Sequence, residues 1–308
     1  MSAARPPEGA HTVAEGTPMG IDIVFVSVFD LAYTVATLAL VSAGLALIFG
    51  LMRVINLAHG EFIVLGGYTT IVALRMGCNI WLAMLIVAPI VVGCFGFLVE
   101  RLVIRHLYGR TVDTMLATWG LSLAISGALS MIFGTTTTGV PNPVGSLSIG
   151  QYQVGGYSLF IIAVSTLLLV SLYLVLRSTR VGMIVRGAMQ SAEVAAALGH
   201  SPQRIYMATF VVGSMVSGLA GGVLSPLVGL APSAGGQFIA KAFITVIAGG
   251  ASVVAGTVSA SALLGTVAKV FELLSSPVVG EMALLICAVI LLRVLPQGIT
   301  SRWFKGAA

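Results

Sequence analysis

Long stretches without a single Asp, Glu, Lys or Arg constrain this 308-residue chain more than any other feature. Five of them reach 22 residues or more, and the longest covers 63 residues, from Thr114 to Leu176. A helix that crosses a bilayer needs about 20 predominantly apolar residues. A soluble protein averages about 25% charged residues, whereas only 8% of this chain is charged. The sequence therefore predicts an all-α protein that crosses the membrane several times.

Charged clusters and Gly or Pro breaks divide the chain into nine expected spans. Eight or ten are also compatible, because the Gly249-Gly250 pair could lie inside the membrane. The spans are expected at about 21–50, 60–77, 80–99, 113–133, 157–176, 204–230, 238–254, 256–274 and 279–295. We expect a flexible N-terminal tail over 1–20, a transmembrane domain over 21–299, an irregular outer loop near 134–156 and a cytoplasmic tail over 300–308.

The basic residues indicate an orientation. If the nine spans alternate, eleven of the fifteen Lys and Arg fall on one side: Arg53, Arg101, Arg105, Arg110, Arg177, Arg180, Arg186, Arg204, Arg293, Arg302 and Lys305. Short basic loops stay in the cytoplasm. We therefore expect the N-terminus outside and the C-terminus in the cytoplasm. The same loops account for the net charge of +5, so the charge does not indicate nucleic-acid binding.

Chemistry-bearing motifs are absent from the sequence. It has no Gly-Lys pair, hence no phosphate-binding P-loop, and no HExxH or GxSxG motif. Cys78, Cys94 and Cys287 are far apart and form no CxxC pair. His59 lacks enough neighbouring ligands for a metal. We expect no catalytic residue, metal or cofactor in this chain, and any use of ATP would fall to partner subunits.

A polar segment, MRVINLAHGEF at 52–62, lies between two apolar runs. The run that follows, Phe62 to Leu74, has 13 residues and covers only about 20 Å of a 30 Å hydrocarbon core. The segment should therefore reach membrane depth, where polar groups must be buried in protein or face water. A solvated cytoplasmic turn is the alternative. If the segment is helical, Asn56 and His59 share a face. The residues expected to line a passage are Asn56, His59, Glu61, Thr118 and Trp119.

Small residues mark one face of the sixth span. Gly213, Ser217 and Gly221 recur every four residues, beside Gly218 and Gly222. Small side chains let helix backbones approach closely in lipid. Packing within the chain and packing against a partner subunit both remain open.

The loop at 177–204 is too long for a tight connector. Ser191 can cap a short helix that has Glu193 in its first turn, and Gly199 suits the end of that helix. Ser201 and Pro202 are typical of the start of the next span. The loop is predicted to hold a short helix at the membrane surface, either without a partner or as a contact for a motor protein.

The segment EVAAALG at 193–199 resembles the EAA---G loop through which ABC importer permeases dock on their ATPase subunits. In this chain Val194 interrupts the EAA. Three further segments match in order and spacing: GLALIFGLMRVINLAHGEFIVLGGY at 44–68, PSAGGQFIAKAF at 232–243 and LPQGI at 295–299. From residue 21 onward the chain resembles the permeases of the branched-chain amino acid, urea and amide ABC importers.

This resemblance implies a type II importer fold, a location in the bacterial cytoplasmic (inner) membrane and a larger assembly. The expected partners are a second homologous permease or a second copy, two cytoplasmic ABC ATPases and an extracytoplasmic solute-binding protein. The residues expected to carry the ATPase coupling are Arg186, Glu193, Ala195, Ala196 and Gly199.

The transported solute is less constrained. The stretch at 106–123 resembles the urea and amide branch, whereas Lys241 resembles the amino-acid branch. The uncharged stretch at 114–176 offers no fixed charge to an α-carboxylate or ammonium group, so we expect urea or a short amide in preference to an amino acid. The alternative function is a secondary transporter or channel without an ATPase, using Glu272 or Glu281 as proton carriers.

Overall fold

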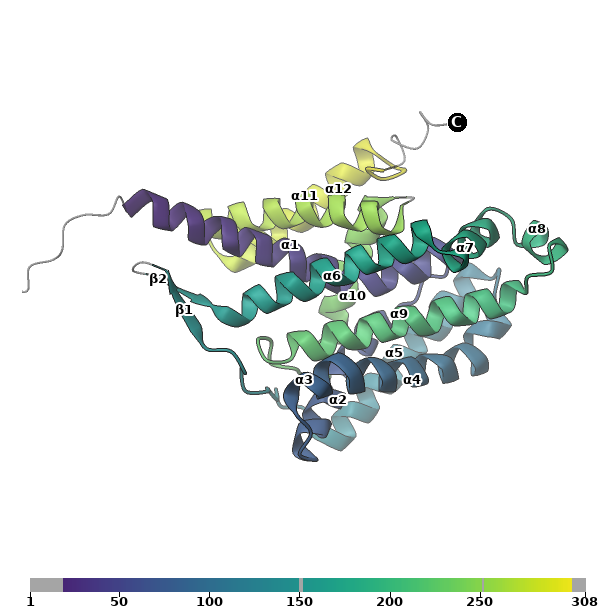
Figure 1. The fold of residues 1–308 in the computed structure, drawn as a ribbon, viewed down its shortest axis with the longest axis horizontal. Helices are drawn as coiled ribbons and strands as arrows, with labels where there is room; N and C mark the ends of the chain where they lie inside the picture. The colour runs from purple at the N-terminus through teal and green to yellow at the C-terminus, as the bar shows by residue number, and fades with distance from the viewer. Residues whose placement is uncertain (1–18, 150–151, 251, 301–308) are drawn as a thin grey trace, which may run out of the picture.

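The computed structural model describes residues 19–149, 152–250 and 252–300. Most of the long helices run along the molecule, with the hairpin of β1 (Ser146–Ile149) and β2 (Tyr152–Gly155) toward one end and the short helices α7 (Arg180–Gln190) and α8 (Ala192–Ala197) at the other (Figure 1). The predicted tails at 1–20 and 300–308 lie almost wholly outside the described residues. Helix α1 begins at Met19, inside the expected N-terminal tail.

Seven helices in the described ranges are long and apolar enough to cross a membrane. They are α1 (Met19–Met52), the continuous segment of α3 (Ile80–Leu82), a π-helical turn (Ala83–Val87) and α4 (Ala88–Leu102), then α5 (Thr111–Phe133), α6 (Gly156–Ser178), α9 (Pro202–Leu224), α11 (Val253–Leu274) and α12 (Pro277–Val294). A 3-10 turn, Ile104–Leu107, links α4 to α5. The all-α polytopic fold is confirmed.

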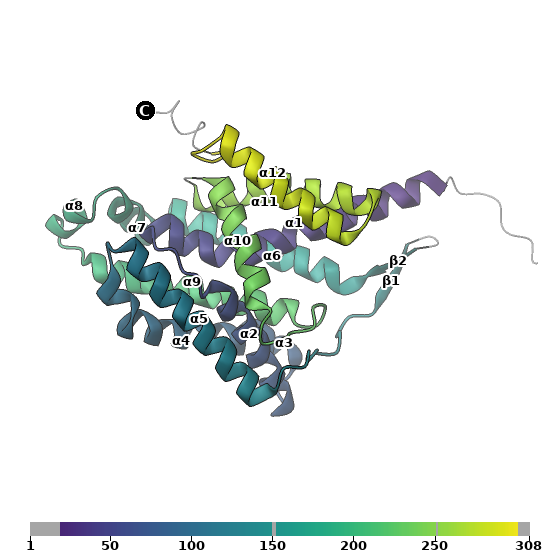
Figure 2. The same cartoon turned by 180° about the vertical axis from the view of Figure 1, so that it is seen from behind.

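The other two expected spans are shorter helices, α2 (His59–Arg75) and α10 (Gly235–Gly249). At 1.5 Å per residue, their 17 and 15 residues reach only about 25 Å and 23 Å, less than the hydrocarbon thickness. Figure 2 shows α10 steeply inclined to α1 and α6, crossing the molecule between α12 and α5. The nine expected spans thus correspond to seven spanning helices and two that do not cross on their own.

Two expectations need correction at the hairpin end. The sixth span was expected to reach residue 230, but α9 ends at Leu224 and turns follow, because Pro226 cannot donate a helical hydrogen bond. Leu230 instead pairs with Thr138 in an isolated antiparallel bridge. The outer loop near 134–156 was expected to be irregular, yet it holds the β1–β2 hairpin, in register from Ser146 opposite Gly155 to Ile149 opposite Tyr152.

The loop at 177–204 follows its prediction and adds a helix. Ser191 Oγ accepts a hydrogen bond from the Val194 N–H at 3.2 Å and so caps α8, and Gly199 follows with φ +85°. Helix α7 was not predicted. It is capped by Thr179, whose Oγ1 accepts from the Gly182 N–H at 3.0 Å. Pro202 begins α9 as expected, although the Ser201 hydroxyl makes no capping bond.

Helix α9 forms the centre of the bundle and packs against α1, α2 and α4. Phe210 of α9 meets Phe62 of α2 edge to face, with ring centroids 6.1 Å apart, and both side chains are fully buried. The core therefore surrounds α2, and this places the polar start of α2 inside the protein.

Candidate functional site

The polar segment after α1 folds back into the bundle. Arg53 ends α1 in a left-handed conformation, with φ 52°. His59, the first residue of α2, then contacts the carbonyl of Val41 through Nε2 at 3.0 Å. Val41 lies eleven residues before the end of α1, hence about 16 Å along the helix axis from that end. The start of α2 is therefore deep within the protein rather than at a membrane surface.

His59 is fully buried and uses both ring nitrogens. Because a carbonyl can only accept, Nε2 carries the hydrogen and donates it to Val41. Nδ1 lies 3.2 Å from the Ser217 hydroxyl oxygen of α9, whose hydrogen can be donated either to Nδ1 or to the Gly213 carbonyl at 2.9 Å. The imidazole thus connects α1, α2 and α9.

Asn56 and Thr118 hold the turn before α2. Asn56 Oδ1 accepts from the Ala58 N–H at 3.1 Å, and Thr118 Oγ1 of α5 accepts from the Leu57 N–H at 3.1 Å. Both side chains are fully buried. Residues 53–58 are not helical, so the condition under which Asn56 and His59 would share a helix face is not met. The side chains of Asn56 and Thr118 thus serve as hydrogen-bond acceptors for the backbone N–H groups of Ala58 and Leu57.

Glu61 lies where α2, α5 and α10 meet. It belongs to the first turn of α2, and its Oε1 accepts from the Ser122 hydroxyl of α5 at 3.1 Å. Its carboxylate touches the first residue of α10, because a Cβ on Gly235 would lie 2.2 Å from Oε1. Oε2 is buried without a hydrogen-bond partner among the described residues. A carboxylate beside helix N-termini is favourably placed, because the helix dipole carries partial positive charge at that end.

Among the five residues predicted to line a passage, the structure leaves only Trp119 accessible, with 56% of its surface exposed. The other four residues are buried within the protein: Asn56, His59, Glu61 and Thr118. Sequence reasoning missed Ser122 and Gly235, which complete the Glu61 cluster from sites 61 and 174 residues away in the chain. The Gly235-Gly236 pair in the PSAGGQF segment was the available signal.

The small residues of the sixth span all pack within this chain. Beyond the bond from Ser217 to His59, Gly213 faces Ile48 of α1, and Gly218 faces Val92 of α4. A Cβ on Gly221 would lie 1.7 Å from the Ile63 carbonyl oxygen of α2, and one on Gly222 would lie 3.0 Å from the Met84 oxygen. This face of α9 is therefore closed by α1, α2 and α4.

The coupling residues cluster at the end of the molecule opposite the hairpin. Arg186 of α7 is exposed and donates to the Leu176 carbonyl at the end of α6. In and after α8, Glu193, Ala196 and Gly199 are exposed, while Ala195 is buried. Several apolar side chains project from the same short helices: Val181, Met183, Val194 and Leu198 are between 58% and 73% exposed. We call this surface, residues 180–199, the knob.

A protein family described as "Branched-chain amino acid transport system / permease component" matches residues 27–295, most of the chain. The chain belongs to this family. It is 25% identical over 287 residues to the high-affinity branched-chain amino acid transport system permease protein LivH of Salmonella typhimurium, covering 87% of this chain and 92% of the relative. It is 26% identical over 252 residues to BraD of Pseudomonas aeruginosa, covering 77% and 82%, and 26% identical over 281 residues to a probable LivH of Methanocaldococcus jannaschii, covering 85% and 88%. No solved structure matches the chain.

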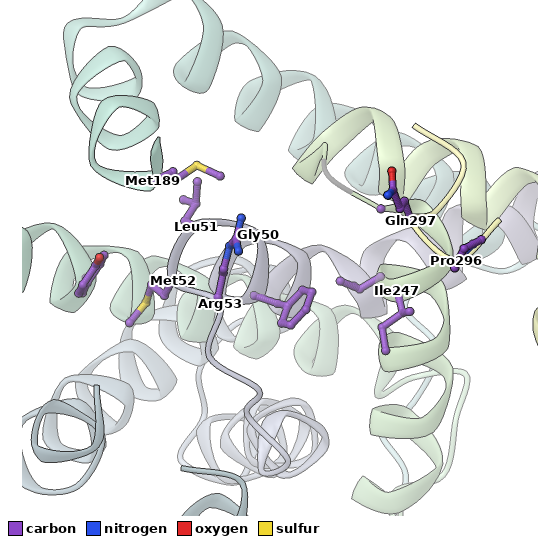
Figure 3. Close-up of a pocket in the computed structure, with 12 residues that line it drawn as sticks. Gly50, Leu51, Met52, Arg53, Met189, Ile247, Pro296 and Gln297 are labelled. Carbon is purple, nitrogen blue, oxygen red and sulfur yellow. The ribbon is translucent and has the colours of Figure 1, made fainter. Parts of the chain in front are cut away.

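The permease has a pocket of about 540 Å³ beside the knob, which sequence analysis did not predict. It lies between the end of α1, the end of α10 and the Pro296-Gln297 turn, and Met189 of α7 borders it next to Leu51 (Figure 3). Beyond that turn, the Ile299 N–H donates to the Ala248 carbonyl at 2.9 Å, which fixes the C-terminal turn to α10. A movement of α7 would therefore act directly on the end of α1, and through α1 on α10.

One ion pair of the permease is turned outward. Lys241 Nζ of α10 lies 2.5 Å from Glu281 Oε1 of α12, and the two side chains are 41% and 64% exposed. Gln237, one turn before Lys241, and Ser233, just before α10, are also exposed. These side chains make α10, which crosses the molecule between α12 and α5 (Figure 2), partly polar at its surface.

Proposed function

We propose that this chain is the membrane-spanning permease subunit of an ABC importer for a branched-chain amino acid. Its N-terminus lies outside and its C-terminus in the cytoplasm. It works with a second homologous permease or a second copy, two cytoplasmic ATPases and an extracytoplasmic binding protein. Family membership over residues 27–295 is the observation that carries this proposal.

The knob supports the coupling role of Arg186, Glu193, Ala195, Ala196 and Gly199. Exposed apolar side chains at the end of a membrane protein, outside its apolar spans, favour contact with another protein. The knob also contacts the end of α1 through Met189 and Leu51. ATP-driven closure of the ATPases would then move α7, the ends of α1 and α10, and with them the access of the passage.

The passage is proposed to run along the face formed by α5, α10 and α12. A charged pair and an exposed polar stripe on α10 are unfavourable against hydrocarbon. Helix α5 also has an unpacked surface, because a Cβ on Gly120 or Gly127 would contact no other residue of the described chain. A second permease that covers this face would enclose a polar passage. Trp119 would line this passage, and the Glu61 cluster would hold the start of α10 against α2 and α5.

The preference for urea or a short amide is not supported. The relatives named above are named for branched-chain amino acid transport. The physical argument for a neutral solute was the lack of fixed charge over 114–176, yet Lys241 and Glu281 bring two charges to the neighbouring helices. An amino acid is therefore the proposed solute.

A secondary transporter is less well supported. The carboxylates expected to carry protons are both ion-paired, Glu281 with Lys241 at 2.5 Å and Glu272 with Lys269 at 3.0 Å. Each carboxylate thus already has a lysine partner within the chain.

Substrate identity can be tested by transport in vesicles that contain the permease, its partner permease and the ATPases. With ATP and the binding protein present, labelled leucine should accumulate and labelled urea should not. Vesicles without the binding protein provide the control. Accumulation of urea without accumulation of leucine would overturn the proposed substrate.

A further inference from the structure

The two lysines that the structure describes have different environments. Lys269 of α11 is 12% exposed and lies 3.4 Å from Asp30 of α1 and 3.0 Å from Glu272. The ion pair between Lys269 and Asp30 links α11 to α1 within the chain. Lys241 instead has a single carboxylate partner, Glu281, and both side chains are open to the outside. The second pair therefore stabilises the fold less and is available to a ligand.

Lys241 and Glu281 lie where a polar part of α10 meets an apolar exposed surface of α12. Glu281 is the only charged residue on the first three turns of α12, and the exposed residues after it, Met282, Leu285 and Ile286, are apolar. On α10, Gln237 is exposed, and the side chain of Lys241, four residues later, is 41% exposed. An intramembrane charge pair usually faces the interior of a bundle or a water-filled cavity. The pair thus belongs to the polar side of α10.

The chemistry of the pair matches a free amino acid. An ammonium group only donates hydrogen bonds, and a carboxylate only accepts them. The α-carboxylate of an amino acid can replace Glu281 as the partner of Lys241, while its α-ammonium replaces Lys241 as the partner of Glu281. Every charge stays paired in this exchange. Urea carries no charge and cannot satisfy either group in this way.

We propose that Lys241 and Glu281 form a transient binding station for zwitterionic amino acids, with Lys241 holding the α-carboxylate and Glu281 the α-ammonium. This inference rests on the proposed function, because it places the pair in the passage. When the solute leaves, Lys241 and Glu281 pair with each other again, so neither charged group is left without a partner. Release is therefore as easy as binding, which a passage requires.

Replacing the charges tests the station in the assembled importer. Lys241→Gln and Glu281→Gln should each lower leucine uptake about tenfold or more, because each removes a charge-assisted hydrogen bond to the solute. ATP hydrolysis stimulated by the loaded binding protein should persist. Arg110→Gln is the matched control, since Arg110 belongs to an exposed pair with Asp113 at a helix end. It should leave uptake unchanged.

The double variant Lys241→Gln/Glu281→Gln separates a station from a structural pair. Removing both members of a structural pair leaves no unpaired charge and should restore most of the activity lost in the single variants. A station predicts that the double variant stays as low as either single variant. Recovery of leucine uptake in the double variant would overturn the proposal.

A cysteine reporter separates failure of the station from failure of the passage. Gln237→Cys, in a background with Cys78, Cys94 and Cys287 replaced by Ala, should react with a membrane-impermeant methanethiosulfonate. Leucine-loaded binding protein should slow this reaction, and Lys241→Gln should abolish the slowing. If Gln237→Cys never reacts, the proposed passage is wrong. If it reacts and leucine protects it equally without Lys241, only the station is wrong.

Discussion

The contact between α2 and α9 allows one stability effect to be worked out from distances. A Cβ on Gly221 would lie 1.7 Å from the Ile63 carbonyl oxygen and 3.0 Å from the Gly67 nitrogen, both in the backbone of α2. Backbone cannot rotate away, so Gly221→Ala must push the two helices apart by more than about 1 Å. A gap of about that size forfeits a quarter to a half of each dispersion contact across the interface. Overpacking typically costs about 1–3 kcal/mol, and we expect the upper end here.

Thermal unfolding of the purified permease in detergent measures this cost. At about 2 °C per kcal/mol for a chain of this size, Gly221→Ala should lower the midpoint by roughly 6 °C. Gly127→Ala on α5 is the control, because the added methyl would contact no other residue of the described chain. It should leave the midpoint unchanged or raise it, since Ala favours a helix over Gly. A Gly221→Ala midpoint equal to that of the control would refute the backbone contact.

Three further substitutions have defined outcomes. Glu193→Arg in the knob should reduce co-purification of the ATPases and ATP-driven uptake together, and unchanged recovery of both would contradict the coupling role. Burial and the neighbouring Glu100 raise the pKa of the Tyr108 phenol, so the phenol stays protonated and donates to the buried Glu100 carboxylate at 2.6 Å. Tyr108→Phe should therefore lower the free energy of unfolding by about 1.5–3 kcal/mol. An unshifted unfolding midpoint would argue against that hydrogen bond. Gly250→Ala should also lower the unfolding midpoint, because Gly250 has φ +83° and a Cβ there would lie 2.7 Å from the Gln297 oxygen. A variant as stable as the parent would mean that the C-terminal turn does not pack against α10.

Local features of the sequence predicted much of the fold. Charge-free runs located the helices, because hydrocarbon excludes unpaired charges whatever the tertiary arrangement. The short apolar run after residue 61 predicted that α2 starts at depth. The cap of α8 at Ser191 was predicted because side-chain capping depends on residues only three apart.

Features that depend on distant residues were not predictable from local patterns. Glu61 meets Gly235 only because α10 crosses the bundle steeply, and nothing near either residue encodes that crossing. The pair of Lys241 with Glu281 links two helices 40 residues apart in the chain. Each appears in the sequence as an isolated charge beside an apolar run, which indicates a functional position but not its partner.

The central claim is that the permease moves its solute only when separate ATPases hydrolyse ATP. The most direct measurement is leucine accumulation in vesicles that hold the complete importer, with intact ATPases or with ATPases unable to hydrolyse ATP, in the presence and absence of an inward proton gradient. Accumulation should occur with intact ATPases and ATP, and it should be absent with the inactive ATPases even when the proton gradient is imposed. Accumulation driven by the proton gradient alone would contradict the account.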